Sequence, residues 1–452
     1  MSTAPARTEW TFFGHPIGLS TLFFTEMWER FSFYGMRALL VLYMKAQFDH
    51  VIANTNIKNP GLGFSQDKAS TIYGLYGGMV YLSPIAGGWI ADKFLGARRS
   101  VFIGGIIIAC GHFTMFLNTL PTFFTGLVLI IIGTGLLKPN VSTMVGDLYK
   151  KNDERRDAGF SIFYMGINLG VIIGPVICGY LGQNVAWHYG FSAAGVGMVL
   201  GLIQYKLGSR FLGDAGLMKK REAEPKKENK KEALTSEEKT RLVVIAILFL
   251  FSVLFWMAFE QQGNSMNLFA DDLTRSVALG RPFPSTWFQS VESVFIVLLA
   301  PVLAWLWGRM GKKQPSSPAK FAIGLFILGL CYVVMTWACT YLGGGRLSPW
   351  WLVGAYCLMA IGELCLSPIG LSTVTKLAPP RFVGAMMGLW FVTISIGDFF
   401  AGQVGRWYDA SKPETLIYLF GGLSVEAIIA AIILFLLTPF IKRMLASTGT
   451  VA

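Results

Sequence analysis

The sequence predicts an all-α membrane protein in which about twelve transmembrane helices form two halves of six. Of the 452 residues, 53% are hydrophobic and only 14% are charged, whereas soluble domains carry about 25% charged residues. The longest polar stretch is rich in Lys and Glu and divides the apolar windows six and six. We therefore expect an N-terminal bundle at 1–207, a cytoplasmic linker at 208–240 and a C-terminal bundle at 241–452.

Apolar windows long enough to cross about 30 Å of hydrocarbon recur along the whole chain. They lie at residues 17–45, 69–91, 100–117, 122–146, 158–181, 187–207, 241–269, 286–307, 319–342, 349–375, 382–407 and 415–440. The 51 glycines cluster within several of these windows. Small residues let transmembrane helices approach closely, so the glycines are interpreted as packing surfaces that can also let helices rock against one another.

The basic residues follow membrane topology. A net charge of +12 is compatible with nucleic-acid binding, but a nucleic-acid binder would concentrate these residues on one face of a soluble module. Here they lie in alternate loops, at Lys93, Arg98, Arg99, Lys150, Lys151, Arg155, Arg156, Arg309, Lys312, Lys313, Lys320, Lys376, Arg381, Lys442 and Arg443, and in the linker, at Lys219, Lys220, Arg221, Lys226, Lys227, Lys230 and Lys231. By the positive-inside rule, both termini of this multi-pass protein are cytoplasmic, and the expected location is the inner membrane.

The cysteines and the N-terminus carry no further signal. Cys110, Cys178, Cys331, Cys339, Cys357 and Cys365 lie in predicted spans without metal-ligand spacing, so we expect packing residues, no disulfides and no metal. Residues 1–15 lack the features of a cleavable signal peptide, and the first span is expected to direct insertion.

The first span contains charged residues. Glu26, Glu29 and Arg30 lie within five residues of each other, and Arg37 follows two turns later. Each charge at the bilayer centre costs about 2.5–3.5 kcal/mol on insertion scales, so such residues usually face a protein-lined cavity and have a function. Helical spacing places Glu26 and Arg30 on one face.

The loop between the second and third spans contains a specific motif. Residues 87–99 read GGWIADKFLGARR, with an acid near a helix end, a glycine at the turn and paired arginines. This loop resembles the signature loop of the major facilitator superfamily, and residues 307–313 repeat it weakly in the second half. The resemblance implies two six-helix bundles that hold a substrate near the membrane midplane and expose it alternately to either side.

Within that superfamily the chain resembles the proton-coupled oligopeptide transporters, the POT/PTR peptide transporter family. Residues 26–35 (EMWERFSFYG) resemble the ExxER signature, and residues 163–170 (FYMGINLG) and 255–261 (FWMAFEQ) resemble motifs of the fifth and seventh helices. The resemblance implies a symporter that imports di- and tripeptides by alternating access, with protons as the coupling ion and no other cofactor. The expected partners are these peptides, protons and the lipid bilayer, with no nucleic acid, and a monomer is the expected functional form.

The charged residues also fit a zwitterionic peptide independently of the resemblance. An unpaired buried charge costs several kcal/mol, so each charged end of the peptide needs a partner of opposite sign. The first half offers Arg30, Arg37 and Lys138, and the second offers Glu260 and Glu363. Position by position, the resemblance assigns the three cations to the peptide carboxylate and Glu363 to the amino terminus. It implies further pocket residues at Tyr34, Tyr81, Asn168 and Trp390. The pairs Arg37–Glu260 and Lys138–Glu363 are the expected gates.

Proton coupling requires a group that changes charge between two environments. His112, in the third span, belongs to no motif and is interpreted as a packed polar residue. Burial and a nearby cation act on a carboxyl group in opposite directions, so a conformational change can make it bind or release a proton. We expect Glu26, Glu29 and Glu260, together with Arg30, to couple proton movement to transport.

The chain departs from the family at several positions. Gly77 stands where mammalian relatives have a histidine, and Glu292 stands where the family commonly has a pocket asparagine, so the amino-terminal subsite is more acidic than usual or Glu292 is protonated. Asp398 is interpreted as the partner of a polar group in the second half. The linker leaves no room for the two extra helices of many bacterial relatives.

Other function classes remain open at this point. A plant-like relative could carry nitrate, and a related facilitator could export drugs. Two alternatives outside the transporters are an intramembrane protease and a channel. The chain has no GxxxxGK[ST] segment, which argues against ATP as the energy source. We do not expect an enzyme.

Overall fold

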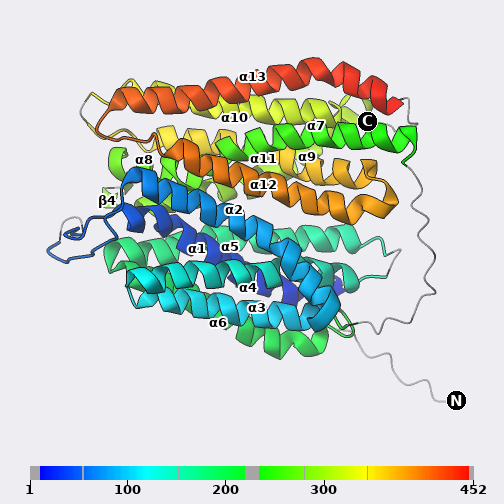
Figure 1. The fold of residues 1–452 in the computed structure, drawn as a ribbon, viewed down its shortest axis with the longest axis horizontal. Helices are drawn as coiled ribbons and strands as arrows, with labels where there is room; N and C mark the ends of the chain where they lie inside the picture. Colours follow the sequence, from blue (N-terminus) through cyan, green and yellow to red (C-terminus); the bar gives the residue numbers. More distant parts are fainter. Residues whose placement is uncertain are drawn as a thin grey trace. The chain divides into compact units, whose positions relative to one another are not determined.

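The structure is a computed structural model that describes residues 11–52, 55–150, 153–218, 234–278, 280–343 and 345–446. Twelve long α-helices account for most of these described residues (Figure 1). They are α1 (Gly18–Lys45), α2 (Gln66–Ile90), α3 (Ala97–Phe116), α4 (Leu120–Asp147), α5 (Arg156–Asn184), α6 (Trp187–Gly208), α7 (Ser236–Phe259), α9 (Phe288–Met310), α10 (Ser317–Cys339), α11 (Trp350–Leu377), α12 (Val383–Gly405) and α13 (Pro413–Ala446).

The remaining elements are short. They are α8 (Ser265–Leu273), a π-helical turn η1 (Ala91–Leu95), and the 3-10 turns η2 (Ser209–Phe211), η3 (Glu260–Gly263), η4 (Ser285–Trp287), η5 (Gly311–Lys313) and η6 (Pro380–Phe382). Two antiparallel hairpins pair β1 (Thr11–Phe12) with β2 (His15–Pro16), and β3 (Val277–Ala278) with β4 (Arg281–Pro282).

The helices confirm the prediction of an all-α membrane protein. Among the described residues, nine helical segments are long and apolar enough to cross a membrane. The other long helices, α1, α2 and α6, have 28, 25 and 22 residues, enough to span about 30 Å at 1.5 Å per residue. All six cysteines are free thiols.

The seventh predicted span, 241–269, differs from the expected continuous helix. The helix α7 ends at Phe259, the turn η3 follows, and α8 begins at Ser265. Side chains of the interrupted segment make tertiary hydrogen bonds: Gln261 Nε2 donates to Ala401 O at 2.9 Å, and Ser70 Oγ donates to Asn264 Oδ1 at 3.1 Å. Irregular backbone at membrane depth is tolerated where protein surrounds it.

The chain divides into two compact units. Unit 1 comprises Met1–Met36, Ser83–Cys178 and His188–Lys220, and unit 2 comprises Arg37–Leu82, Gly179–Trp187 and Arg221–Ala452. In unit 1, α3 packs along α4 over a buried apolar core. In unit 2, α10 packs against α11 and α13, and α7 packs against α12. Residues 219–233 of the predicted linker, with the seven basic residues named for it, lie outside the described residues.

The signature loop forms a tight turn within unit 1. Gly96 follows η1 with φ of 75°, in the left-handed region that favours glycine. Arg98, the second residue of α3, donates through Nη2 to Gly213 O at 2.6 Å and to Ala215 O at 2.9 Å. The arginine therefore ties the start of α3 to the segment that follows α6.

Close contact between α3 and α4 depends on glycine. A Cβ added to Gly104 would lie 2.6 Å from Gly133 O and 2.9 Å from Leu137 N, both backbone atoms. Backbone cannot move aside as a flexible side chain can, so the two helices meet here only without a side chain.

Gly104→Ala should therefore destabilise the protein by about 1–3 kcal/mol through overpacking, despite the better helix propensity of alanine. Thermal unfolding of the detergent-solubilised protein measures this loss. The control Gly354→Ala lies at an exposed helical glycine with nothing within 4 Å of an added Cβ, and it should be neutral or stabilising. Equal behaviour of the two variants would contradict the packing argument.

Candidate functional site

The charged residues of the first helix form a buried cluster in unit 1. Glu26, Glu29 and Arg30 expose 3%, 1% and 4% of their surface. Arg30 Nε lies 3.2 Å from Glu26 Oε1 and also pairs with Glu29. The Arg30 guanidinium carbon lies 5.5 Å from the centre of the Phe33 ring. The close approach of α5 depends on Gly170, because a Cβ there would lie 2.8 Å from Arg30 Cβ.

A second cation balances this cluster. The half-buried Lys138, on α4 beside the intrahelical Pro139, interacts electrostatically with Glu26. Two carboxylates and two cations sum to zero charge, which avoids the cost of a net charge in a low-dielectric interior. A proton or an anionic ligand that enters the cluster must compete with one of these pairs.

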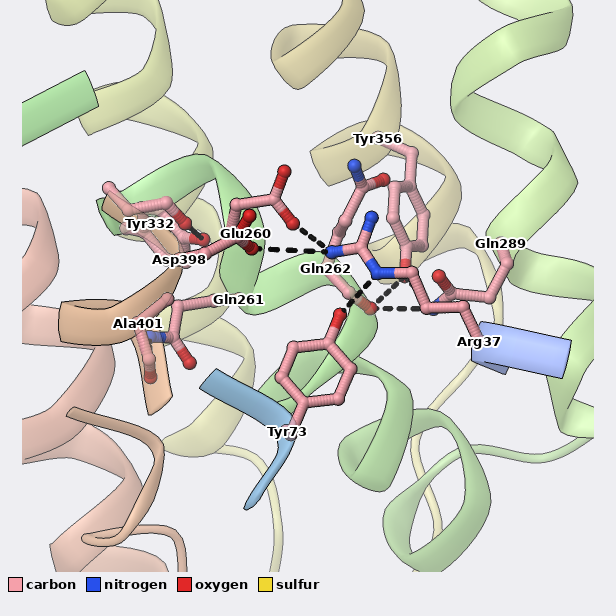
Figure 2. A network of polar contacts seen from close by, with 11 residues as sticks. Arg37, Tyr73, Glu260, Gln261, Gln262, Gln289, Tyr332, Tyr356, Asp398 and Ala401 are labelled. Carbon is pink, nitrogen blue, oxygen red and sulfur yellow. Dashed lines mark hydrogen bonds and ion pairs between the residues drawn. The ribbon is translucent and has the colours of Figure 1, made fainter. Parts of the chain in front are cut away.

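Unit 2 holds a second charged cluster, around Arg37 at the C-terminal half of α1 (Figure 2). Arg37 forms an ion pair with Glu260, the first residue of η3, and donates through Nε to Tyr73 Oη at 2.8 Å. Its Nη2 also lies 3.9 Å from Asp398 Oδ1. All four side chains are at least 95% buried, so the contacts are shielded from bulk water. The break after α7 places the Glu260 carboxyl group in the protein interior.

The η3 turn also offers an accepting carbonyl group. Gln289 Nε2 donates to Gln262 O at 2.5 Å, and Tyr356 Oη donates to the same oxygen at 3.5 Å. Figure 2 shows these contacts beside the Arg37 cluster. The turn is thus held by side chains from α9 and α11 as well as by α12.

Glu292 on α9 and Glu363 on α11 lie together in unit 2. Their carboxyl groups form a hydrogen bond with each other, and Ser293 Oγ donates to Glu292 Oε2 at 3.3 Å. An ionised carboxylate only accepts hydrogen bonds, so a bond between two carboxyl groups requires a proton on one of them. Of the two alternatives for Glu292, this contact favours a protonated pair.

The predicted polar and aromatic pocket residues have different surroundings. Asn168 is 4% exposed and donates through Nδ2 to Tyr164 O within α5 at 3.0 Å. Tyr34 is half-buried, with its ring against Phe33. Tyr81 is 8% exposed.

Trp390 is packed within unit 2. It is 1% exposed and lies between Phe249 and Phe321, with ring centres 6.2 and 6.3 Å away. The Trp390 ring also covers Gly370, whose missing side chain leaves room for it. In this conformation the indole supports the fold of the second half, and its contact with a substrate stays a prediction.

The structure brings together only part of the predicted site. Arg37 meets Glu260 as predicted, and Glu26, Glu29 and Arg30 share one cluster. Lys138 belongs to unit 1 and Glu363 to unit 2, so their pairing stays a prediction, as do all the functional roles assigned to these residues.

Sequence reasoning missed Tyr73 and Glu426. A tyrosine in a span is most often a packing or interfacial residue, so nothing marked Tyr73 as the hydrogen-bond partner of Arg37. Glu426 is a half-buried acid within α13, and no hydrogen-bond partner for its carboxyl oxygens is described. A scan of every acid inside a predicted span could have found it.

His112 is fully buried in α3, beside Gly195 of α6, whose added Cβ would lie 3.2 Å from His112 Cβ. Neither ring nitrogen has a hydrogen-bond partner among the described residues. No hydrogen bond of the described residues therefore joins the His112 side chain to the charged cluster of unit 1.

Unit 2 also contains a pocket of about 870 Å³, lined by ends of helices. Lys45 Nζ lies 3.8 Å from Asp272 Oδ2, and Tyr408 Oη donates to the same carboxylate oxygen at 3.1 Å. Burial, with a further contribution from the Asp272 carboxylate, raises the pKa of Tyr408 well above its usual range, so the hydroxyl group stays a donor. None of the predicted site residues lines this pocket.

Comparison with known proteins places the chain in a family. The sequence pattern of the POT family matches residues 98–230 and 217–415. The peptide transporter YePEPT of Yersinia enterocolitica is 38% identical over 97% of each chain, and a di-/tripeptide transporter of Lactococcus lactis subsp. cremoris is 37% identical over 97% of this chain and 98% of its own. A crystal structure of a POT peptide transporter in complex with sulfate superposes with a TM-score of 0.87 at 39% identity, over 96% of this chain and 97% of the other. The chain thus belongs to the POT family of proton-coupled oligopeptide transporters and has their major facilitator superfamily fold.

Proposed function

We propose that this protein imports di- and tripeptides together with protons across the inner membrane by alternating access. Its full-length similarity to named peptide transporters supports the substrate class. The observation that carries the proposal is the pair of buried charged clusters, around Arg30 in unit 1 and around Arg37 in unit 2. Buried charges that are paired but exchangeable are what a zwitterion and a proton can compete for.

The peptide is held by its two charged ends. Its carboxylate binds the cations of the first half, and its ammonium group binds the acids of the second, because each buried charge needs a partner of opposite sign. The proposed substrate-binding residues are Arg30, Tyr34, Arg37, Tyr81, Lys138, Asn168, Glu292, Glu363 and Trp390. The proton shared by Glu292 and Glu363 must leave or move when an ammonium group takes its place.

Ion pairs act as the gates. Arg37 with Glu260 closes the outer side, and Lys138 with Glu363 links the bundles until peptide and proton compete for these charges. Glu26, Glu29, Arg30 and Glu260 couple proton movement to this exchange. The ligand must bind the two conformations of the transporter with different affinities, since equal affinity would leave their populations unchanged.

The same proposal includes the topology. Bundles at 1–207 and 241–452 are joined by the cytoplasmic linker 208–240, both termini are cytoplasmic, and a monomer is the functional form. The chain transports peptides without cleaving them.

Counterflow with purified protein in liposomes tests the function. Labelled di-alanine should exchange against unlabelled peptide with saturation and emerge intact, whereas nitrate and a cationic dye should compete poorly. Cleaved peptide inside the vesicles would indicate a protease, and flux that neither saturates nor shows counterflow would indicate a channel. Preferential exchange of nitrate or of the dye would mean that this compound, and not a peptide, is the substrate.

His112→Ala should retain concentrative uptake of di-alanine, because the buried His112 ring has no hydrogen-bond partner among the described residues. Uptake driven by a pH gradient is the measurement, with thermal unfolding as the control for folding. If the variant folds and exchanges peptide but loses the uptake that the pH gradient drives, a histidine route for the proton exists.

A further inference from the structure

Arg37 contacts two buried acids, although the gating proposal uses only one. Its guanidinium group pairs with Glu260 and lies 3.9 Å, through Nη2, from Asp398 Oδ1 on α12 (Figure 2). Asp398 is fully buried, with 0% of its surface exposed, and Glu260 is 2% exposed. Each acid comes from a different element, so the arrangement is built by tertiary packing.

Counted over its described ion pairs, this cluster has one more acid than it has cations. Among the described contacts, the charged and titratable groups beside Asp398 are Arg37 from α1 and Tyr73 from α2, and Arg37 in turn pairs with Glu260 from η3. With both carboxyl groups ionised and the phenol neutral, one cation meets two anions, and the net charge is −1. A net charge without a partner costs several kcal/mol in the interior, whereas a single proton on one carboxyl group makes the cluster neutral.

The geometry indicates which acid holds the proton. Glu260 has the close ion pair with Arg37, and Asp398 lies at the outer limit of an ion-pair distance. The electrostatic attraction to the cation falls with distance, so the ionised form is favoured at Glu260 and the neutral form at Asp398.

The helix α2 leaves space for the Asp398 carboxyl group. A Cβ on Gly77 would lie 2.8 Å from Asp398 Oδ1 and 2.9 Å from Asp398 Cγ. A Cβ on Gly74, one turn earlier, would lie 2.9 Å from the Asp398 backbone oxygen. On the α7 side, Gly397 packs against the backbone of Trp256 and Met257. Asp398 therefore occupies space that is available only because residues 74 and 77 are glycines.

We propose that Asp398 is a second proton-coupling carboxyl group, which holds a proton while Arg37 is paired with Glu260 and releases it when that pair opens. The inference rests on the proposed proton-coupled transport. On release the Asp398 O–H bond breaks, the proton passes to water on the inner side, and the resulting carboxylate replaces Glu260 as the anionic partner of Arg37. The next proton from the outer side restores the neutral acid.

Asp398→Asn tests the proposal, because the amide resembles the protonated carboxyl group in shape and cannot ionise. Counterflow of di-alanine, which needs no net proton movement, should persist. Each coupled proton can contribute a tenfold accumulation for a gradient of one pH unit, so accumulation at that gradient should fall about tenfold. The pH profile of uptake should also lose one titration step.

Glu426→Gln is the matched control. It also removes an intramembrane acid, but no ion pair of Glu426 is described, and it should keep the wild-type accumulation. Wild-type accumulation and pH profile in Asp398→Asn would overturn the inference while leaving the proposed function intact. Absence of di-alanine counterflow in wild type would instead reject the proposed function.

A spectroscopic measurement keeps the test independent of folding of the Asn variant. Infrared difference spectra of wild type in liposomes, recorded across pH, should show the C=O stretch of a protonated carboxyl group that shifts in Asp398→Glu and is retained in Glu426→Gln. If this band is the same in wild type and in Asp398→Glu, Asp398 does not hold the proton and the inference fails.

Discussion

Glu29→Gln and Glu26→Gln should each abolish uptake of di-alanine driven by a pH gradient, while peptide counterflow stays at least partly intact. Both carboxyl groups are buried against Arg30, and an amide can neither carry the proton nor balance the guanidinium charge. Counterflow needs no net proton movement, so it separates coupling from binding. Uptake with and without the gradient, in the same liposomes, measures the effect.

The control for this pair is Glu237→Gln, at an exposed acid in the first turn of α7. It removes the same charge outside both charged clusters and should leave both assays unchanged. Full gradient-driven uptake in both Glu26→Gln and Glu29→Gln would remove this motif from the proton path.

An N-acetylated dipeptide should compete far less well than the free peptide against wild type, and Glu363→Gln should make this penalty smaller. Removing one partner of a buried, hydrogen-bonded charge pair typically costs about 2–5 kcal/mol. In Glu363→Gln the acid that faces the ammonium group is already absent, so acetylation has less left to remove. Competition against labelled di-alanine, with each peptide on each protein, gives the coupling as a double-mutant cycle.

Amidation of the carboxyl end provides the control for orientation. Its penalty should persist in Glu363→Gln, because the proposed partners of that end are Arg30, Arg37 and Lys138. Glu292→Gln should also reduce the acetylation penalty, since the Glu292 carboxyl group is hydrogen-bonded to that of Glu363. Independent, additive losses for every combination would contradict the proposed orientation.

Most helices were predictable because a membrane span is a local property of the sequence. The window 17–45 corresponds to the helix Gly18–Lys45, and 415–440 lies within Pro413–Ala446. The break after Phe259 was not predictable in the same way. The segment there is held by Ser70 and Ala401, which are remote in sequence and form hydrogen bonds with the side chains of Asn264 and Gln261.

The contacts of the candidate site were likewise only partly predictable from the sequence. Charge complementarity suggested the Arg37–Glu260 pair, because two opposite charges inside spans need partners. Asp398 was expected to meet a polar group of the second half, whereas the structure places it near Arg37 of α1, in space that Gly77 leaves on α2. The hydrogen bond between Glu292 and Glu363 likewise depends on the packing of α9 against α11.

The central claim, proton-driven peptide import, is tested most directly by accumulation of labelled di-alanine in liposomes that contain the purified protein and have an acidic outside. We expect accumulation above the external concentration, which a protonophore collapses and which disappears when the inside and outside pH are equal. Equilibration of the peptide to the same concentration with and without the pH gradient would contradict the account.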